Sequence, residues 1–250
     1  MKKAGIILLV VLAVLIAVYS HSYAEEPSFA LSTKFWSQYL DNNGAVNHDQ
    51  PVLQSDLFIS LPLGFYFDFW HSMGLDETGL STDFGDEINY TLGWGGTLNG
   101  FGFDLGFSYL DFIDLFKMPK GDVLRPYAEI NKEFKITEKN ILTPYARWDG
   151  SFPASGNSPE KDQWFSLGLK HVWQINETAE LKQKLFTLYD TGALGFAKAV
   201  IGQYNIGLGW NVTKSVTLDL PNFKISTPLT PVNDGRKTEF VIGAGLSLRF

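Results

Sequence analysis

The chain has 250 residues, of which 20 are basic and 27 acidic, giving a formal net charge of −7. This acidic balance argues against nucleic-acid binding by bulk charge. The sequence has no cysteine, which excludes disulfides and thiolate metal sites. Aromatic residues make up 15% of the chain and there are 24 glycines, a combination that is unusual for a soluble globular domain.

The N-terminus has the pattern of a secretory signal peptide. A cationic start precedes an apolar run from Ala4 to Val18, and small residues follow up to Ala24. The apolar run is shorter than the roughly 20 residues that a membrane-spanning helix needs. We therefore expect residues 1–24 to be a signal peptide that is cleaved before Glu25. Residues 25–250 are then the mature chain, with no linker that would divide it into domains.

The mature chain alternates apolar with small or polar residues at a period of two, which is the period of a β-strand. In the last segment, Phe240, Ile242 and Ala244 alternate with Glu239 and Gly243. A strand with one apolar and one polar face suits a wall between lipid and a wet lumen. Strands are predicted at 28–39, 51–61, 64–72, 84–95, 99–110, 123–136, 141–150, 163–175, 179–189, 198–212, 215–225 and 237–250.

Short and long connections alternate between these segments. Tight turns are predicted at Leu61–Gly64, Thr97–Gly100, Thr137–Asn140, Asn176–Thr178 and Thr213–Ser215. Longer links are predicted near 40–50, 73–83, 111–122, 150–162, 190–197 and 226–236. This asymmetry is typical of outer-membrane barrels, which have short periplasmic turns and longer outer loops.

A sheet in hydrocarbon must pair every backbone polar group, so it can span a bilayer only when it closes. The predicted fold is therefore all-β: a transmembrane antiparallel up-and-down β-barrel of about 12 strands in the bacterial outer membrane. Aromatic residues near strand ends would form its interfacial girdles, with packing in a soluble barrel as the alternative. They are Trp94, Tyr109, Trp148, Trp173 and Trp210.

Two resemblances support this prediction. The final strand ends in Phe250 after alternating apolar residues, which is similar to the C-terminal signature that outer-membrane barrels present to their assembly machinery. The stretch Gln50-Pro51-Val52-Leu53-Gln54-Ser55-Asp56-Leu57, followed by Gly64-Phe65-Tyr66, resembles the second strand and hairpin of the TorF-type porin family. Phe84-Gly85-Asp86-Glu87-Ile88-Asn89-Tyr90 with Gly93-Trp94 resembles that family's fourth strand. The resemblance covers residues 33–110 and implies a porin without catalytic residues.

Barrels of this size can also be lipid hydrolases, which need a nucleophile beside an oriented base. The mature chain offers His48, His71 and His171 as imidazole bases. His71 beside Ser72 is the best catalytic candidate, but adjacent strand residues point to opposite faces. His171 falls on the apolar side of its strand, so we expect it at an interfacial or lipid-facing position.

A metal site is not predicted either. The acidic residues Asp76-Glu77, Asp83 and Asp86-Glu87 lack the regular ligand spacing of a calcium loop. A solvated acidic loop is the preferred interpretation, and no catalytic residue, cofactor or metal is expected.

Charged residues on the polar side of the strands are the predicted functional set. Charge in a low-dielectric wall is costly unless it is paired or wet. These residues either pair across the lumen and close it, or line water and select solutes. The lumen-lining candidates are Lys34, Asp56, Asp68, Asp104, Glu129, Arg147, Lys170, Asp219, Glu239 and Arg249.

The leading hypothesis is a monomeric, narrow, porin-like channel for passive diffusion of small hydrophilic solutes or ions. Its expected partners are outer-membrane lipid, the barrel assembly machinery and those solutes, and no nucleic acid. Two alternatives remain open: a lipid-modifying hydrolase with His71 or His48 as base, and a closed structural or adhesive barrel acting through its outer loops.

Overall fold

The computed structural model describes residues 27–75, 86–111, 122–154 and 161–250. The predicted signal peptide lies outside these ranges, as do Asp76, Glu77 and Asp83. Within them, no helix is long and apolar enough to cross a bilayer.

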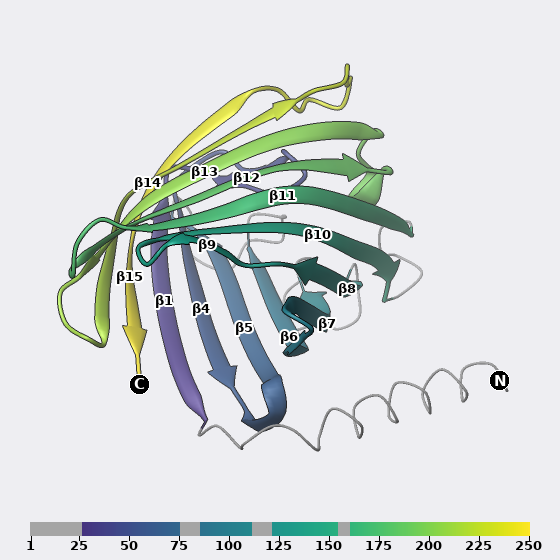
Figure 1. The fold of residues 1–250 in the computed structure, drawn as a ribbon. Coiled ribbons are helices and arrows are strands. Elements are labelled where there is room, and N and C mark those ends of the chain that lie inside the picture. Colours follow the sequence, from purple (N-terminus) through teal and green to yellow (C-terminus); the bar gives the residue numbers. More distant parts are fainter. Residues whose placement is uncertain (1–26, 76–85, 112–121, 155–160) are drawn as a thin grey trace, which may run out of the picture.

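Twelve long antiparallel strands form one closed sheet (Figure 1), which confirms the predicted fold and strand number. Each strand pairs with its neighbours along the chain, and the last strand pairs with the first. The strands are β1 (Ser28–Trp36), β4 (Val52–Ser60), β5 (Phe65–Gly74), β6 (Glu87–Leu98), β7 (Phe101–Asp111), β8 (Val123–Asn131), β10 (Asn140–Pro153), β11 (Asp162–Gln174), β12 (Ala179–Asp190), β13 (Ala199–Asn211), β14 (Val216–Pro228) and β15 (Glu239–Arg249).

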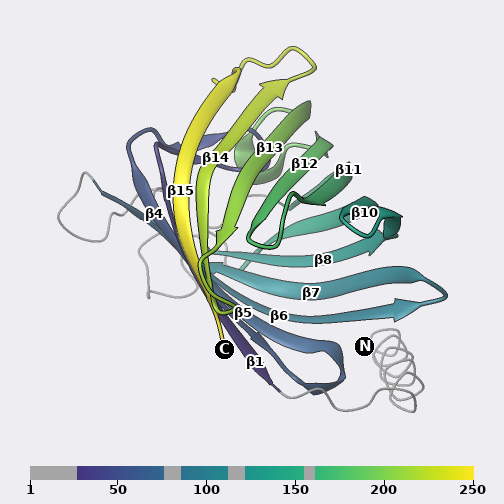
Figure 2. The same cartoon turned by 60° about the vertical axis from the view of Figure 1, so that its left-hand side comes forward.

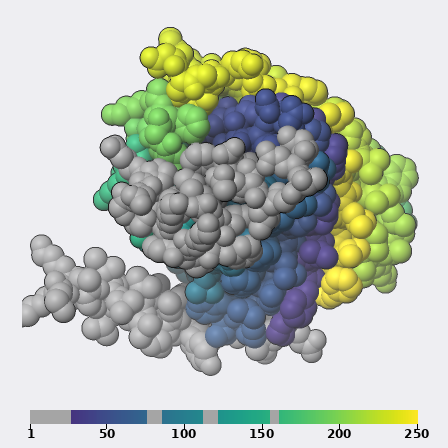
Figure 3. Space-filling model, turned by 180° about the vertical axis from the view of Figure 1, so that it is seen from behind, coloured from purple at the N-terminus to yellow at the C-terminus, as the bar shows by residue number. Residues whose placement is uncertain are grey.

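The barrel closes where its two ends meet. In the register of β1 with β15, Ala30 lies opposite Arg249 and Trp36 lies opposite Gly243. Figure 3 shows the purple β1 between the yellow β15 and the blue strands that follow it in the chain. Figure 2 shows the strands tilting around the barrel. No strand edge in the described wall is left open, as a sheet in lipid requires.

The segment predicted as one strand at 123–136 is divided in the structure. It forms β8 and then β9 (Phe134–Thr137), which both pair with β10. The ladder is interrupted between the pairs Asn131–Tyr145 and Phe134–Leu142. Pro144 of β10 lies in this gap and has no N–H to donate, so the ladder cannot continue regularly there.

The alternation of short and long connections is confirmed. Residues 61–64, 99–100, 138–139, 175–178 and 212–215 make the short turns at one end. Asn99 and Gly100 both have positive φ, at 52° and 76°, the backbone of a two-residue type I′ hairpin turn. At the opposite end of the barrel the strand ends are separated by longer stretches of sequence, 37–51, 75–86, 112–122, 154–161, 191–198 and 229–238, of which the first and the last two are fully described.

The two faces of the wall are inverted relative to a soluble protein. Leu92 and Leu167 point outward and are 60% and 66% exposed. Thr91 and Ser166, their neighbours in the same strands, point inward and are buried. An exposed apolar belt around a polar interior is the arrangement that lipid stabilises.

The aromatic residues predicted for the girdles lie near both barrel ends. Trp173 and Trp210 are exposed beside short turns, and the Trp94 indole N–H donates to Leu63 O of another short turn at 3.0 Å. At the opposite end, the Trp148 indole N–H donates to Gln163 at 2.9 Å and Tyr109 bonds to Asp122. Two aromatic belts are typical of membrane barrels.

Candidate functional site: a narrowed polar lumen

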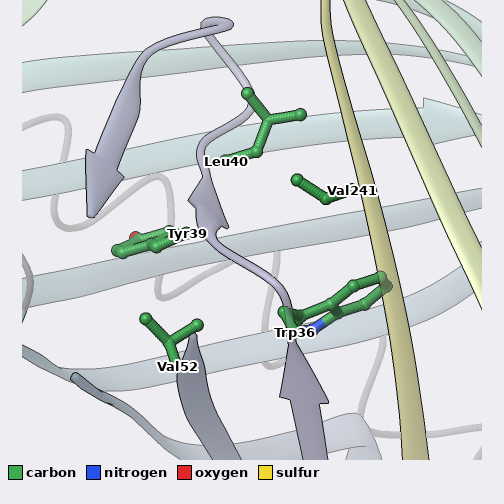
Figure 4. Close-up of a cluster of buried hydrophobic side chains, with 5 residues drawn as sticks. All are labelled: Trp36, Tyr39, Leu40, Val52 and Val241. Atoms are coloured by element: carbon green, nitrogen blue, oxygen red, sulfur yellow. The ribbon is translucent and has the colours of Figure 1, made fainter. Parts of the chain in front are cut away.

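The first long link does not extend outward from the barrel. Residues 37–51, which we call the inner loop, carry the short strands β2 (Tyr39–Leu40) and β3 (Val46–His48), which pair with each other. Figure 4 shows the side chain of Leu40 near that of Val241 on β15, and Val52 near Tyr39. Together with Trp36 these residues form a buried apolar cluster. The prediction of an ordinary outer loop at 40–50 is therefore wrong, because this cluster holds the segment inside the wall.

Polar contacts tie the inner loop to widely separated strands. The Tyr39 hydroxyl donates to Glu87 of β6 at 2.6 Å. Burial and the nearby Glu87 raise the pKa of Tyr39 well above its ordinary value, so the phenol keeps the proton that it donates. On the other side, Gln203 Nε2 of β13 donates to Asp41 O at 2.7 Å. The inner loop thus crosses the lumen from one wall to the other.

Arg236, which lies close to the C-terminus, binds the inner loop near the N-terminus. Its side chain is 1% exposed and forms an ion pair with Asp190 at 2.8 Å and another with Asp234 at 2.7 Å. Its Nη1 also donates to Asn43 O of the inner loop at 3.0 Å, and its Nη2 donates to Ala197 O. This one guanidinium therefore joins three long links, and we call it the Arg236 clasp.

The lumen wall from β4 to β10 mixes phenols, carboxylates and guanidinium groups. It borders a cavity of about 710 Å³ that Asn42 of the inner loop also lines. Tyr66 donates to Asp104 at 2.6 Å. Arg147 makes a bidentate contact with Asp149, with its nearest nitrogen at 2.7 Å, and its guanidinium lies 4.0 Å from the ring centre of Tyr127. Paired charges of this kind can remain ionised inside the wall.

The facing wall, from β11 through β15 to β1, is rich in lysine. It borders a cavity of about 440 Å³ lined by Lys34, Lys170, Lys182, Lys184 and Lys224. Three of these have carboxylate partners: Lys170 with Glu129 at 2.6 Å, Lys182 with Glu180 at 2.6 Å, and Lys34 with Asp219 at 4.0 Å. The lumen therefore has a basic side and a mixed side.

The ten charged residues predicted to face the lumen follow the inward alternation of their strands. Lys34, Asp219, Glu129, Lys170, Arg147 and Asp104 make the contacts given above. The carboxyl groups of Asp56 and Asp68 lie against each other, and Glu239 accepts a bond from Gln38 of the inner loop at 3.2 Å. Arg249 is exposed near the short-turn end. Their effect on permeation stays a prediction.

The structure also locates groups that the sequence-based set missed. These are Lys182, Lys184 and Lys224 on the basic side, and Arg236 at the clasp. The β14 register shifts between Asp219 and Asn222. This shift brings Lys224 to the inward face, although simple alternation from Asp219 assigns it outward.

The three histidines lie apart from one another. Ser72 is buried on the inward face, where Gln54 donates to it at 3.3 Å, and His71 is on the outward face of β5. His171 is on the outward side of β11 but is half-buried, and it hydrogen-bonds to Asn140 at 2.7 Å and Gln183 at 3.0 Å. His48 lies in the inner loop beside a cavity of about 680 Å³ at the mouth of the barrel. Among the described residues, no group of three or more His, Asp or Glu is placed to hold a metal ion.

A closed sheet of this size with a polar interior defines the fold class of the outer-membrane porins and channels. Solved structures with a similar fold include the NanC porin, at a TM-score of 0.57 and 9% identity, covering 88% of this chain and 98% of the porin. The KdgM porin matches at 0.56 and 10% identity, over 88% of this chain and 99% of its own. An outer membrane channel from Pseudomonas putida F1 matches at 0.53 and 12% identity, over 92% and 98%.

These likenesses show a shared fold. No protein-family model matches the chain, and no curated protein matches it either. The resemblance of residues 33–110 to the TorF-type porin family therefore stays a prediction.

Proposed function

We propose that the protein is an outer-membrane channel through which small hydrophilic solutes or ions diffuse passively, and that it acts as a monomer. The observation that carries this proposal is the pair of charged cavities, of about 710 and 440 Å³, inside a wall whose outer face is apolar. A protein interior that only needed to be stable would not require so many ionisable groups, because each must be paired or hydrated.

The geometry supports a narrow and selective passage over a wide one. Eight-stranded barrels are filled by side chains and barrels of sixteen strands leave an aqueous channel, so a twelve-stranded lumen lies between them. The inner loop narrows it further, since it contacts β6 on one side and β13 on the other. Solutes would pass beside the inner loop, where charged side chains replace part of their hydration.

Membership of the TorF-type porin family is part of the same proposal, supported by the sequence resemblance over residues 33–110. So are contacts with outer-membrane lipid through the exposed apolar belt, and recognition by the barrel assembly machinery through Phe250. Phe250 is 75% exposed, and its backbone is anchored to Phe29 by bonds of 2.9 and 3.2 Å.

Single-channel recording in planar bilayers tests the proposal. Refolded residues 25–250 should produce discrete, reproducible current steps, and detergent without protein should produce none. The folded state of the same sample is verified by its heat-dependent migration on a gel. A folded sample that never conducts contradicts the channel.

A closed barrel is a second candidate function, favoured by the inner loop and its several anchors. It predicts that the wild-type protein is silent and that removal of the Arg236 clasp opens a conducting path. A conducting wild-type protein contradicts it.

A further inference from the structure

We propose that Lys184 and Lys224 form an anion-binding subsite on the basic side of the lumen, directly below the inner loop. Its ligands would be small organic anions that carry carboxylate groups. This inference rests on the proposed channel function and names the solute class that its lumen favours.

The first argument is the register of the strands. Lys170 of β11 lies opposite Lys184 of β12, Lys184 lies opposite Asn205 of β13, and Asn205 lies opposite Lys224 of β14. Side chains directly opposite each other in a sheet are close neighbours, and like charges in such positions destabilise the sheet. A row with three lysines in four adjacent positions is therefore unfavourable unless negative charge compensates it.

The protein supplies only part of that compensation. Glu129 pairs with Lys170 at 2.6 Å. Among the described residues, neither Lys184 nor Lys224 has a carboxylate oxygen within the 4.0 Å of an ion pair, although both line the cavity of about 440 Å³. Two ammonium groups at this cavity are thus left for a ligand or for water.

Aromatic rings hold both side chains in place. Lys224 Nζ lies 4.4 Å from the ring centre of Trp36, and Lys184 Nζ lies 4.8 Å from that of Phe186 and 5.3 Å from that of Tyr145. A ring face attracts a cation without neutralising its charge. The ammonium groups are therefore oriented in advance and still able to attract an anion.

The inner loop lies next to this row of side chains, on the side of the long links. Gln203 lies opposite Ser226 in the same two strands, two positions from the pair Asn205–Lys224 and on the same inward face. Gln203 donates to Asp41 O at 2.7 Å, and a Cβ atom added to Gly44 would lie 3.0 Å from the Ser226 hydroxyl. The lysines thus lie where the lumen is narrowed, so a solute that passes there comes close to them.

Asn205 adds a polar group to the same place. Its side-chain oxygen is buried and has no hydrogen-bond partner among the described residues. Because the oxygen and nitrogen of an amide side chain exchange places on rotation by half a turn, the NH₂ group can be presented in the same position. A carboxylate between Lys184 and Lys224 would then accept from Asn205 as well.

The test replaces both lysines with glutamine, Lys184→Gln with Lys224→Gln. The matched control is Lys139→Gln with Lys214→Gln, which removes the same charge from two exposed residues in short turns. Reversal potentials in a KCl gradient should show that the wild-type channel prefers anions. For two charges about 5 Å from the ion path at about 0.1 M salt, the preference should fall about fivefold in the lumen variant. The control should keep it.

A second readout works without conduction. Citrate is titrated calorimetrically into the folded protein in detergent, where wild type and control should bind it and the lumen variant should not. If the channel conducts without anion preference, or if the variant keeps the preference and citrate binding, the subsite is overturned and the channel stands. If the protein never conducts but loses citrate binding with the two lysines, the subsite stands and the channel falls.

Discussion

Substitution of the clasp, Arg236→Met, should release the inner loop while the barrel stays intact. Methionine keeps much of the apolar volume but removes the bonds to Asp190, Asp234 and Asn43 O. Asp190 would remain fully buried without its cation. Breaking a buried ion pair by removing one partner costs about 3–5 kcal/mol. Of these bonds only that to Asn43 O reaches the inner loop itself. A hydrogen bond of a charged group contributes about 1.5–3 kcal/mol, and the upper figure corresponds to a rise of about 100-fold in the fraction of inner loop that is open.

Hydrogen exchange of backbone amides measures that fraction. In the inner loop, Asp41 N–H donates to Ala45 O at 2.9 Å and Gly44 N–H donates to Asp41 O at 3.1 Å. Both amides should exchange about 100-fold faster in the variant. Lys237→Met is the control, since Lys237 is a neighbouring cation whose side chain is 76% exposed. Unchanged exchange at these amides in a folded Arg236→Met barrel would refute the clasp. The same variant should conduct more current per channel.

Three further outcomes are expected. Gly44→Ala should loosen the inner loop by about 1–2 kcal/mol, because its φ of +80° disfavours a Cβ that would also crowd Ser226; equal exchange rates would contradict this. Burial acts to raise the pKa of Asp234, but hydrogen bonds to its carboxylate, above all the bond from Arg236, bring this pKa below the ordinary 3.8. The ion pair of Asp234 with Arg236 therefore stabilises the inner loop above pH 3.8, and this stabilisation is lost as the pH falls through the lowered pKa. Amide exchange in the inner loop should therefore accelerate only under acid conditions. Deletion of Phe250 should lower the amount of assembled barrel in outer-membrane fractions, while refolding in detergent persists.

The strand pattern was predictable because lipid and water impose opposite demands on alternate residues. Outward residues such as Leu167 and Phe240 must be apolar, and inward neighbours are free to be polar. Turn residues marked where strands end, since Asn99-Gly100 is a typical two-residue hairpin turn whatever the rest of the fold. Both signals are local, and therefore visible in the sequence.

The lumen was only partly predictable because its remaining determinants are not local. Lys224 faces inward because a bulge in β14 shifts the inward–outward alternation by one residue. The sequence pattern does not reveal that shift. Lys184 shares its inward face with Phe186 and Leu188, which pack in an apolar cluster around Ala193, so both faces of β12 look partly apolar. The inward course of the inner loop depends on residues such as Arg236, nearly 200 positions away.

This separation in the chain has a consequence for biogenesis. Two anchors of the inner loop, Gln203 and Arg236, lie 162 and 193 residues downstream of the backbone oxygens that they bind. These two anchors can form only when β13 and the 229–238 link are in place, whereas the bond from Tyr39 to Glu87 needs only the first third of the chain. Contacts with β6 alone leave the inner loop held on one side of the lumen, and it is held on both sides only when the C-terminal third of the chain has joined the sheet.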